Sequence, residues 1–477
     1  MTTTTPIPML DLMFFLTESI DNPRHVGSVL ILRKPRRGGA QAVQQIVDAY
    51  RAASPRAPFN RIPVFLRSGR PLWHELAEVD ARQHVMHLAL PSPGTDRQLH
   101  ELVAELHAPM LERDRPGWQV YVIDGLADDR FAIYHKCHHA LIDGESGMEI
   151  LRRSLAESPT DRSIRPPAGL EHPTRSRPAP RALQQRLERD ARLLARRTRS
   201  IGVGSLYLVE QVLDGLRGYA PGSIRSFTAP HTPMNEPICN ARAVTHTVLP
   251  LDGMKAIAHR TGTTLNDVTL CLIDAAMHRC LRERGRVPDR PLVALCPVSL
   301  RDEGIKEATT NVSAIWPPLG PVNARIDRRL QSIAANTRAA KAQLKSLGKD
   351  VAYAYAVMAF AVSEALAIAR PEFIGMRPAN VLVSNVRGPV RPLYLNGARL
   401  EALFPVSTLL AGIGLNVTFM SYARQVVLGF TANGAALPEV ERLGRYVDDA
   451  YTRLERATAT ARHPSVRHSA RRPEATV

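Results

Sequence analysis

Cysteine is scarce in this sequence, and the few cysteines follow no recognisable spacing. The 477 residues include five cysteines and no CxxC pair. An odd number of isolated cysteines argues against a disulfide framework and a structural zinc site, and it favours a reducing compartment. The N-terminus also lacks the basic and apolar regions of a signal peptide. We therefore expect a cytoplasmic protein.

Long hydrophobic runs are equally rare. The run of about membrane-spanning length, Val351–Ala369, is interrupted by Ser363 and Glu364. A glutamate near the middle of such a helix costs roughly 2–3 kcal/mol of insertion free energy, and the many alanines contribute little. The run therefore predicts a buried or membrane-surface helix, not a transmembrane span.

Acidic residues are outnumbered, and the positive excess is concentrated in two segments. The 62 Lys and Arg against 45 Asp and Glu give a formal net charge of +17. Residues 160–200 contain eleven arginines and four acids, and residues 461–477 contain four arginines and one acid, so these segments carry ten of the charges. Basic segments of this kind bind nucleic acid or an anionic membrane surface.

Proline and arginine divide the chain into two α/β regions, 1–158 and 226–460, with a connecting segment, 159–225, and a tail, 461–477, that we expect to be disordered. The connecting segment begins as a Pro/Arg-rich linker and continues as a basic helix with Leu183, Leu187 and Leu194 on one face. Such a helix either lies on a membrane surface or crosses between two lobes. Two lobes of similar size predict a site between them.

Apolar runs and helical periodicity predict individual elements in both regions. The expected strands include 26–32, 119–123, 244–249, 292–297, 381–384 and 425–430, and the expected helices include 97–106, 251–261, 266–283 and 438–454. A further strand over Phe131–Cys137 precedes the most informative part of the sequence.

Two adjacent histidines follow that strand directly. His138, His139 and Asp143 fall in a loop, Gly144 permits a turn, and a helix is predicted to resume near Glu145. Three readings are open: the histidines bind metal, they are structural, or one is a general base while its neighbour and Asp143 hold the loop. The chain lacks HExxH spacing, and adjacent residues of an extended backbone point to opposite sides, which disfavours metal ligation. Histidine also exchanges protons near neutral pH, which suits a base.

Motifs of competing mechanisms are absent from the sequence. It contains no GxSxG nucleophile elbow and no P-loop, and Gly412-Ile413-Gly414 lacks the third glycine of a dinucleotide fingerprint. Direct transfer assisted by a histidine base is therefore favoured over a covalent intermediate.

The segment from His138 to Gly144 fits the HHxxxDG motif of acyl-CoA-dependent acyltransferases, which include chloramphenicol acetyltransferase and peptide-synthetase condensation domains. With its companion motifs, the chain resembles the bacterial wax ester synthase/diacylglycerol acyltransferase family over residues 8–458. The companions are Pro8-Met-Leu-Asp11, Asn22-Pro-Arg-His-Val-Gly27, Leu90-Pro-Ser-Pro-Gly94, Asp114-Arg-Pro-Gly-Trp118, Asn266-Asp267-Val268, Pro297-Val-Ser-Leu-Arg301 and Ser384-Asn-Val-Arg-Gly-Pro389.

The resemblance implies a two-lobe, chloramphenicol-acetyltransferase-like α/β (α+β) fold with its channel between the lobes. It implies transfer of a fatty acyl group from acyl-CoA to diacylglycerol or a long-chain alcohol, with His139 as general base and without a metal or other cofactor. His138 is then a packing residue, Asp143 a structural residue paired with Arg301, and Gly144 a turn residue.

Two further motif pairs have both a structural and a functional reading. Asn266 and Asp267 either cap a helix or, as the family implies for Asn266, lie near the reaction channel. Ser384 and Asn385 either form a turn or donate hydrogen bonds to CoA or the oxyanion.

The sequence departs from the family pattern at a few positions, and these bear on substrate preference. Arg24 replaces a common methionine, Arg387 replaces a proline, and Gly117 and Gln119 flank Trp118 where the family commonly has leucine and glutamate. None of these departures falls within the histidine motif.

Two rival functions remain at this stage. One is the same acyl transfer with a different acceptor, such as an amine or another alcohol. The other is a non-catalytic protein that binds lipid or nucleic acid through its basic segments. The resemblance favours an enzyme that meets an anionic membrane or lipid droplet from the cytoplasmic side and binds no nucleic acid.

Overall fold

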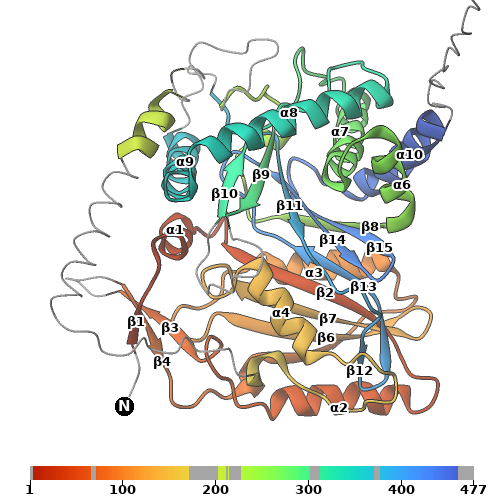
Figure 1. Cartoon of the computed structure of the whole chain (residues 1–477). Helices are drawn as coiled ribbons and strands as arrows, with labels where there is room; N and C mark the ends of the chain where they lie inside the picture. The colour runs from red at the N-terminus through yellow and green to blue at the C-terminus, as the bar shows by residue number, and fades with distance from the viewer. Residues whose placement is uncertain are drawn as a thin grey trace, which may run out of the picture.

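The computed structural model describes residues 4–65, 71–170, 202–210, 213, 227–300, 312–369 and 376–459. In these residues the chain forms two six-stranded sheets, each with its own helices, and a small three-stranded sheet at one edge (Figure 1). The expected mixed α/β architecture with two lobes is confirmed.

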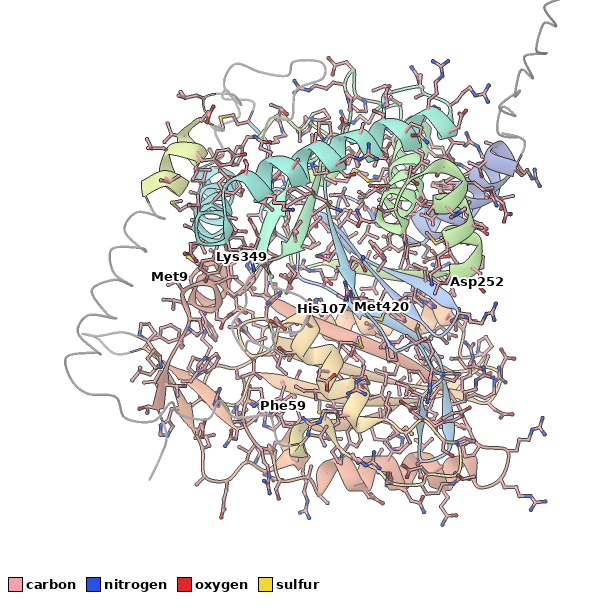
Figure 2. All side chains as sticks on the ribbon, viewed as in Figure 1. Met9, Phe59, His107, Asp252, Lys349 and Met420 are labelled. Atoms are coloured by element: carbon pink, nitrogen blue, oxygen red, sulfur yellow. The ribbon has the colours of Figure 1, made fainter. Side chains whose placement is uncertain are left out.

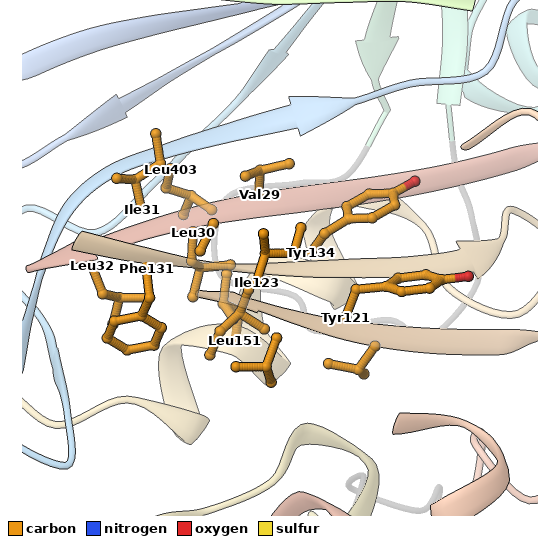
Figure 3. Close-up of a cluster of buried hydrophobic side chains, with 14 of the residues drawn as sticks. Val29, Leu30, Ile31, Leu32, Tyr121, Ile123, Phe131, Tyr134, Leu151 and Leu403 are labelled. Carbon is orange, nitrogen blue, oxygen red and sulfur yellow. The ribbon is translucent and has the colours of Figure 1, made fainter. Parts of the chain in front are cut away.

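The first sheet has the strand order β12-β13-β2-β7-β6-β5. Its neighbours are antiparallel except for the parallel pair β5 and β6. The strands are β2 (His25–Arg33), β5 (Val85–Ala89), β6 (Trp118–Leu126), β7 (Arg130–His138), β12 (Tyr394–Leu395) and β13 (Ala398–Val406). Branched and aromatic side chains of β2, β6 and β7 pack into a core that includes Leu30, Ile123 and Phe131 (Figure 3).

The helices that pack on this sheet include α2 (Gly39–Arg51), α3 (Asp96–His107) and α4 (Gly144–Ser154). Helix α3 begins where the sequence supplies a capping box, because the Thr95 hydroxyl accepts from the Gln98 N–H while the Gln98 side chain accepts from the Thr95 N–H. At the edge lie helix α1 (Met9–Thr17) and the small sheet of β1 (Thr4–Pro6), β4 (Leu72–Glu75) and β3 (Arg61–Val64).

The second sheet has the order β10-β9-β11-β14-β15-β8. Its strands are β8 (Arg242–Pro250), β9 (Ala294–Ser299), β10 (Val312–Ile315), β11 (Val381–Val386), β14 (Leu415–Tyr422) and β15 (Gln425–Asn433), of which β9, β11 and β14 run parallel. Helices α6 (Leu251–Thr261), α7 (Leu265–Glu283), α8 (Ile326–Ser346) and α10 (Glu441–Ala459) pack around this sheet (Figure 1).

The lobes are joined by an exchange of strands. Strands β12 and β13 come from the second half of the chain but pair in the first sheet, where β13 lies against β2. The expected boundaries at residues 158 and 226 assigned both strands to the second lobe, and the structure places them in the first sheet. Where β13 passes β15, a Cβ on Gly429 would lie 2.2 Å from the carbonyl oxygen of Pro405, so only glycine allows the approach. Met420 of β14 and His107 of α3 lie in the band between the halves (Figure 2).

Most expected elements are confirmed, with ends that shift by no more than five residues. The largest shifts are at α10, which spans Glu441–Ala459 instead of 438–454, and at the C-terminal ends of β6 and β15, each of which extends three residues further than expected. The apolar run forms α9 (Lys349–Ala369), and no helix among the described residues is long and apolar enough to span a membrane. The basic helix expected around Leu183, Leu187 and Leu194 and the tail lie outside the described residues, whereas residues 202–210 are helical.

Candidate active site

A cavity of about 420 Å³ lies between the two sheets. Mainly alternate residues of its bordering strands line it, as expected when one face of each strand points inward. They include Val26 and Ser28 of β2, His135 and Cys137 of β7, Leu382, Ser384 and Val386 of β11, and Asn416, Thr418 and Met420 of β14. Helices α1 and α9 add apolar side chains, among them Phe14 and Phe360. The cavity is therefore shared by both lobes and is largely apolar.

His139 follows β7 and lines this cavity. Its main-chain N–H donates to the carbonyl oxygen of Arg24 at 2.8 Å, which extends the β2–β7 ladder by one step. Its ring stacks on Phe14 of α1 with 4.1 Å between centroids and 18° between planes. The imidazole is thus positioned by a backbone hydrogen bond and an aromatic face at the wall of the cavity.

The surroundings of His139 keep its ring uncharged. Burial lowers the pKa of His139 to about 4, and the nearby Asp143 carboxylate opposes that shift only in part. At neutral pH the imidazole is therefore in the form that accepts a proton.

His138 points away from the cavity and is buried at 5% exposure. Its ring stacks on Phe15 with 4.1 Å between centroids. Its Nδ1 accepts from the Ala140 N–H at 3.2 Å, so the proton is on Nε2, which lies 3.4 Å from Oε1 of Glu18. Although burial alone would raise it, the pKa of Glu18 falls to about 2 because the carboxylate interacts with His138, Arg113 and the Arg24 N–H. The two histidines thus face opposite sides, as their adjacency on a strand predicts.

Asp143 and Gly144 begin helix α4. Asp143 is the N-cap, and its Oδ1 accepts from the Ser146 N–H at 2.7 Å. The backbone of Gly144 is not in the left-handed region, and a Cβ there would lie 3.6 Å from Cγ2 of Val386 in the opposite lobe. An added Cβ would therefore make only an ordinary contact with β11, and the turn role of Gly144 stays a prediction. Arg301, the expected partner of Asp143, lies outside the described residues.

The other predicted site residues separate into two groups. Ser384 and Asn385 of β11 line the cavity. Asn266 and Asp267 lie in the first turn of α7 and do not line it. Asp267 forms a capping box with Thr264, and its Oδ1 also accepts from the Thr337 hydroxyl at 2.6 Å. The helix-capping reading of Asp267 is confirmed, whereas the channel role of Asn266 stays a prediction.

Beside the histidine loop lies a buried ion pair that no sequence motif indicated. Arg24 is fully buried and pairs with Glu364 of α9. The same guanidinium donates to the carbonyl oxygens of Leu409 at 2.6 Å and Thr17 at 3.2 Å. The sequence did contain a hint of this pair, because each residue is an isolated charge where an apolar residue is expected. Arg24 occupies a position that the family commonly fills with methionine, and Glu364 lies inside the apolar run.

No group of three His, Cys, Asp or Glu side chains that could hold a metal occurs in the part of the chain that the structure describes. Burial also lowers the pKa of His135, which lines the cavity, to about 4. The absence of a cofactor stays a prediction.

Comparison with known proteins identifies the family of this chain. Residues 8–269 match the model described as the wax ester synthase/diacylglycerol acyltransferase catalytic domain, and residues 310–455 match the WS/DGAT C-terminal domain. The chain belongs to the wax ester synthase/diacylglycerol acyltransferase family. It is accordingly an acyltransferase.

Relatives of this family align along nearly the whole chain. A Mycobacterium tuberculosis protein named probable diacylglycerol O-acyltransferase Tgs4 is 35% identical over 465 residues, covering 96% of this chain and 98% of its own. A second one from that organism, tgs2, is 31% identical over 468 residues, covering 94% and 98%. The wax ester synthase/diacylglycerol acyltransferase of Marinobacter aquaeolei superposes with a TM-score of 0.75 at 28% identity, covering 95% of this chain and 100% of that one.

The fold extends beyond the family. The first condensation domain of the calcium-dependent antibiotic synthetase superposes with a TM-score of 0.53 at 15% identity, covering 95% of this chain. This likeness concerns the fold alone, and it confirms the expected two-lobe architecture.

Proposed function

We propose that the chain transfers a fatty acyl group from acyl-CoA to the hydroxyl of diacylglycerol or a long-chain alcohol, with His139 as the general base. The single observation that carries this assignment is the uncharged His139 ring at the wall of an apolar cavity between the lobes. Fatty chains fit such a wall, and the uncharged imidazole can accept the proton of the acceptor hydroxyl.

In this mechanism the acceptor hydroxyl gives its proton to the His139 imidazole while its oxygen attacks the thioester carbonyl carbon. The tetrahedral adduct collapses as the carbon–sulfur bond breaks, and the imidazolium returns the proton to the sulfur, which leaves as the CoA thiol. A thiol with a pKa near 8.5 is a fair leaving group, so activating the alcohol is the harder task. A positioned base contributes about 10²–10⁴-fold to such a step.

The decisive experiment compares His139→Ala with the native enzyme in an assay with labelled palmitoyl-CoA and a panel of dioleoylglycerol, hexadecanol and a long-chain amine. We expect ester formation from at least one alcohol, and its loss by at least 10²-fold in a variant that keeps the native melting temperature. His87→Ala, on the exposed side of β5, is the matched control and should keep the native rate. A folded His139→Ala variant with native activity would remove the proposed base, and acylation of the amine alone would select the rival acceptor class.

The same proposal includes contact with a lipid surface on the cytoplasmic side of the membrane or on lipid droplets. Helical residues 202–210 expose Val203, Leu206 and Val209 at 41%, 72% and 54%. This helix packs on α9 through Gly204, next to Tyr355 and Met358. Because α9 also lines the cavity, an apolar surface beside it would take acceptor lipid directly from the membrane.

Helix α1 adds to this exposed apolar surface. Its Met9 lies at the outer edge of the molecule (Figure 2) and is 52% exposed, and Leu16 on the same helix is 65% exposed. We expect co-sedimentation with phosphatidylglycerol vesicles, weakened by Leu206→Ser combined with Leu16→Ser. Val248→Ser, on β8, is the control. Unchanged binding of the double variant would remove this surface from the proposal.

A further inference from the structure

A short chain of polar side chains interrupts the apolar wall of the cavity where the two sheets meet. The hydroxyls of Ser407, directly after β13, and Thr418 of β14 lie 2.9 Å apart. The Thr418 hydroxyl donates to Oδ1 of Asn416 at 3.0 Å, and Nδ2 of Asn416 donates to the carbonyl oxygen of Thr408 at 2.8 Å. All four residues line the cavity.

The directions of these hydrogen bonds follow from the amide. Nδ2 of Asn416 faces a carbonyl oxygen, so Oδ1 is the acceptor for Thr418. The single proton of Thr418 is thereby committed to Asn416, and Ser407 must be the donor of the bond between the two hydroxyls. Of these three side chains, Ser407 is therefore the one whose hydroxyl proton can turn toward a bound ligand. Thr418 and Asn416 then keep the hydrogen bonds that they donate.

Ser407 lies on the same face of the first sheet as His139. Strand β13 pairs with β2 up to Val406 and Gly27, so the next step places Ser407 beside Val26. Val26 pairs with Cys137, two residues before His139, and alternate residues of a strand share a face. The Ser407 N–H donates to the Thr431 hydroxyl at 3.0 Å, which fixes the backbone from the opposite lobe. A firmly held donor thus shares the cavity with the proposed base.

We propose that Ser407 is a substrate-binding residue whose hydroxyl donates a hydrogen bond to a carbonyl oxygen of a bound ester, with Thr418 and Asn416 as positioning residues. The inference rests on the proposed function, which brings two such carbonyls into the cavity. One belongs to the acyl-CoA thioester, where a donor stabilises the oxyanion of the tetrahedral adduct. The other belongs to the ester groups of diacylglycerol, where a donor distinguishes this acceptor from a monohydric alcohol.

The experiment measures Ser407→Ala with palmitoyl-CoA and, separately, hexadecanol and dioleoylglycerol. A thioester contact predicts a fall in kcat of about 10²–10³-fold with both acceptors. A contact with diacylglycerol predicts a fall in kcat/KM on the order of 10-fold with dioleoylglycerol alone. Ser407→Thr keeps the hydroxyl and should retain most of the activity. Thr418→Val frees Ser407 from its partner, and it should reproduce the acceptor pattern of Ser407→Ala with a smaller loss.

The control is Ser154→Ala in α4, outside the cavity lining, because the Ser154 hydroxyl is buried and donates to the Leu151 carbonyl oxygen at 2.7 Å. It should keep native kinetics. Native kinetics of Ser407→Ala with both acceptors, in a variant with native melting temperature, would overturn the inference, as would equal losses in Ser407→Ala and Ser407→Thr. If the native enzyme acylates neither acceptor, the proposed function itself fails instead.

Discussion

The buried pair of Arg24 and Glu364 offers a sharp test of how the active site is assembled. The two side chains are 0% and 4% exposed, and Glu364 also accepts from the Ala411 N–H at 3.1 Å. Removing one partner of a buried ion pair costs about 3–5 kcal/mol, whereas replacing both by apolar residues of similar volume is often neutral. The loss of stability should therefore depend on which of the two side chains is replaced.

The two single variants should differ in stability because a buried carboxylate can take up a proton, whereas a buried guanidinium cannot lose one. In Glu364→Gln the guanidinium of Arg24 stays buried and charged, because arginine does not deprotonate in proteins. We expect the full loss of about 3–5 kcal/mol of stability. In Arg24→Met the remaining carboxylate escapes its penalty by taking up a proton, since burial already raises the pKa of Glu364 above its usual value. This variant should lose less, and the Arg24→Met/Glu364→Leu double variant should be more stable than Glu364→Gln.

Thermal unfolding midpoints of the four proteins, measured at pH 7, check this ordering. The matched control is a glutamate of an exposed pair: Glu157→Gln removes the partner of Arg391 on the surface, where both side chains are more than half exposed. An exposed pair contributes about 0–1 kcal/mol, and its midpoint should hardly move. Native stability of Glu364→Gln, or a double variant less stable than Glu364→Gln, would refute the reasoning.

Three further predictions concern the site and the lobes. Because the pKa of His139 is about 4, its base form persists as pH falls, and kcat/KM should stay level from pH 8 to about 5 and drop below that; a midpoint near 6.5 would contradict the burial of the ring. Asp143→Asn should keep the cap of α4 while Asp143→Ala loses about 1 kcal/mol in thermal unfolding, and equal losses would show that the charge itself is needed. Gly429→Ala should destabilise by about 1–3 kcal/mol by pressing on Pro405, whereas Gly202→Ala, with open space around it, should not.

The elements that sequence predicts well are those whose signals are local. Helix α6 begins and ends at Leu251 and Thr261 as expected, because the apolar periodicity stops at Gly262, whose left-handed backbone closes the helix. The opposite orientations of His138 and His139 were equally predictable, since they follow from the alternation of a strand.

Long-range pairing is what the sequence could not supply. Nothing local in Ala398–Val406 says that this strand leaves the second lobe to pair with β2, because its alternation fits an edge of either sheet. The partner of Glu364 is 340 positions away in the chain. An isolated charge in an apolar run shows that a partner must exist, but only the fold identifies it.

The presentation of the proposed base depends on both halves of the chain. Two successive residues of α1, Phe14 and Phe15, stack on the two successive histidines, so a small rotation of this helix would move both rings. The C-terminal end of α1 is held by Arg24, which in turn is neutralised by Glu364 from the second lobe. The HHxxxDG motif therefore supplies the imidazole, but contacts between residues hundreds of positions apart in the sequence orient it. A chain that has the motif but lacks these contacts would carry the imidazole without orienting it. The motif alone is therefore a weaker argument for catalysis than the cavity around it.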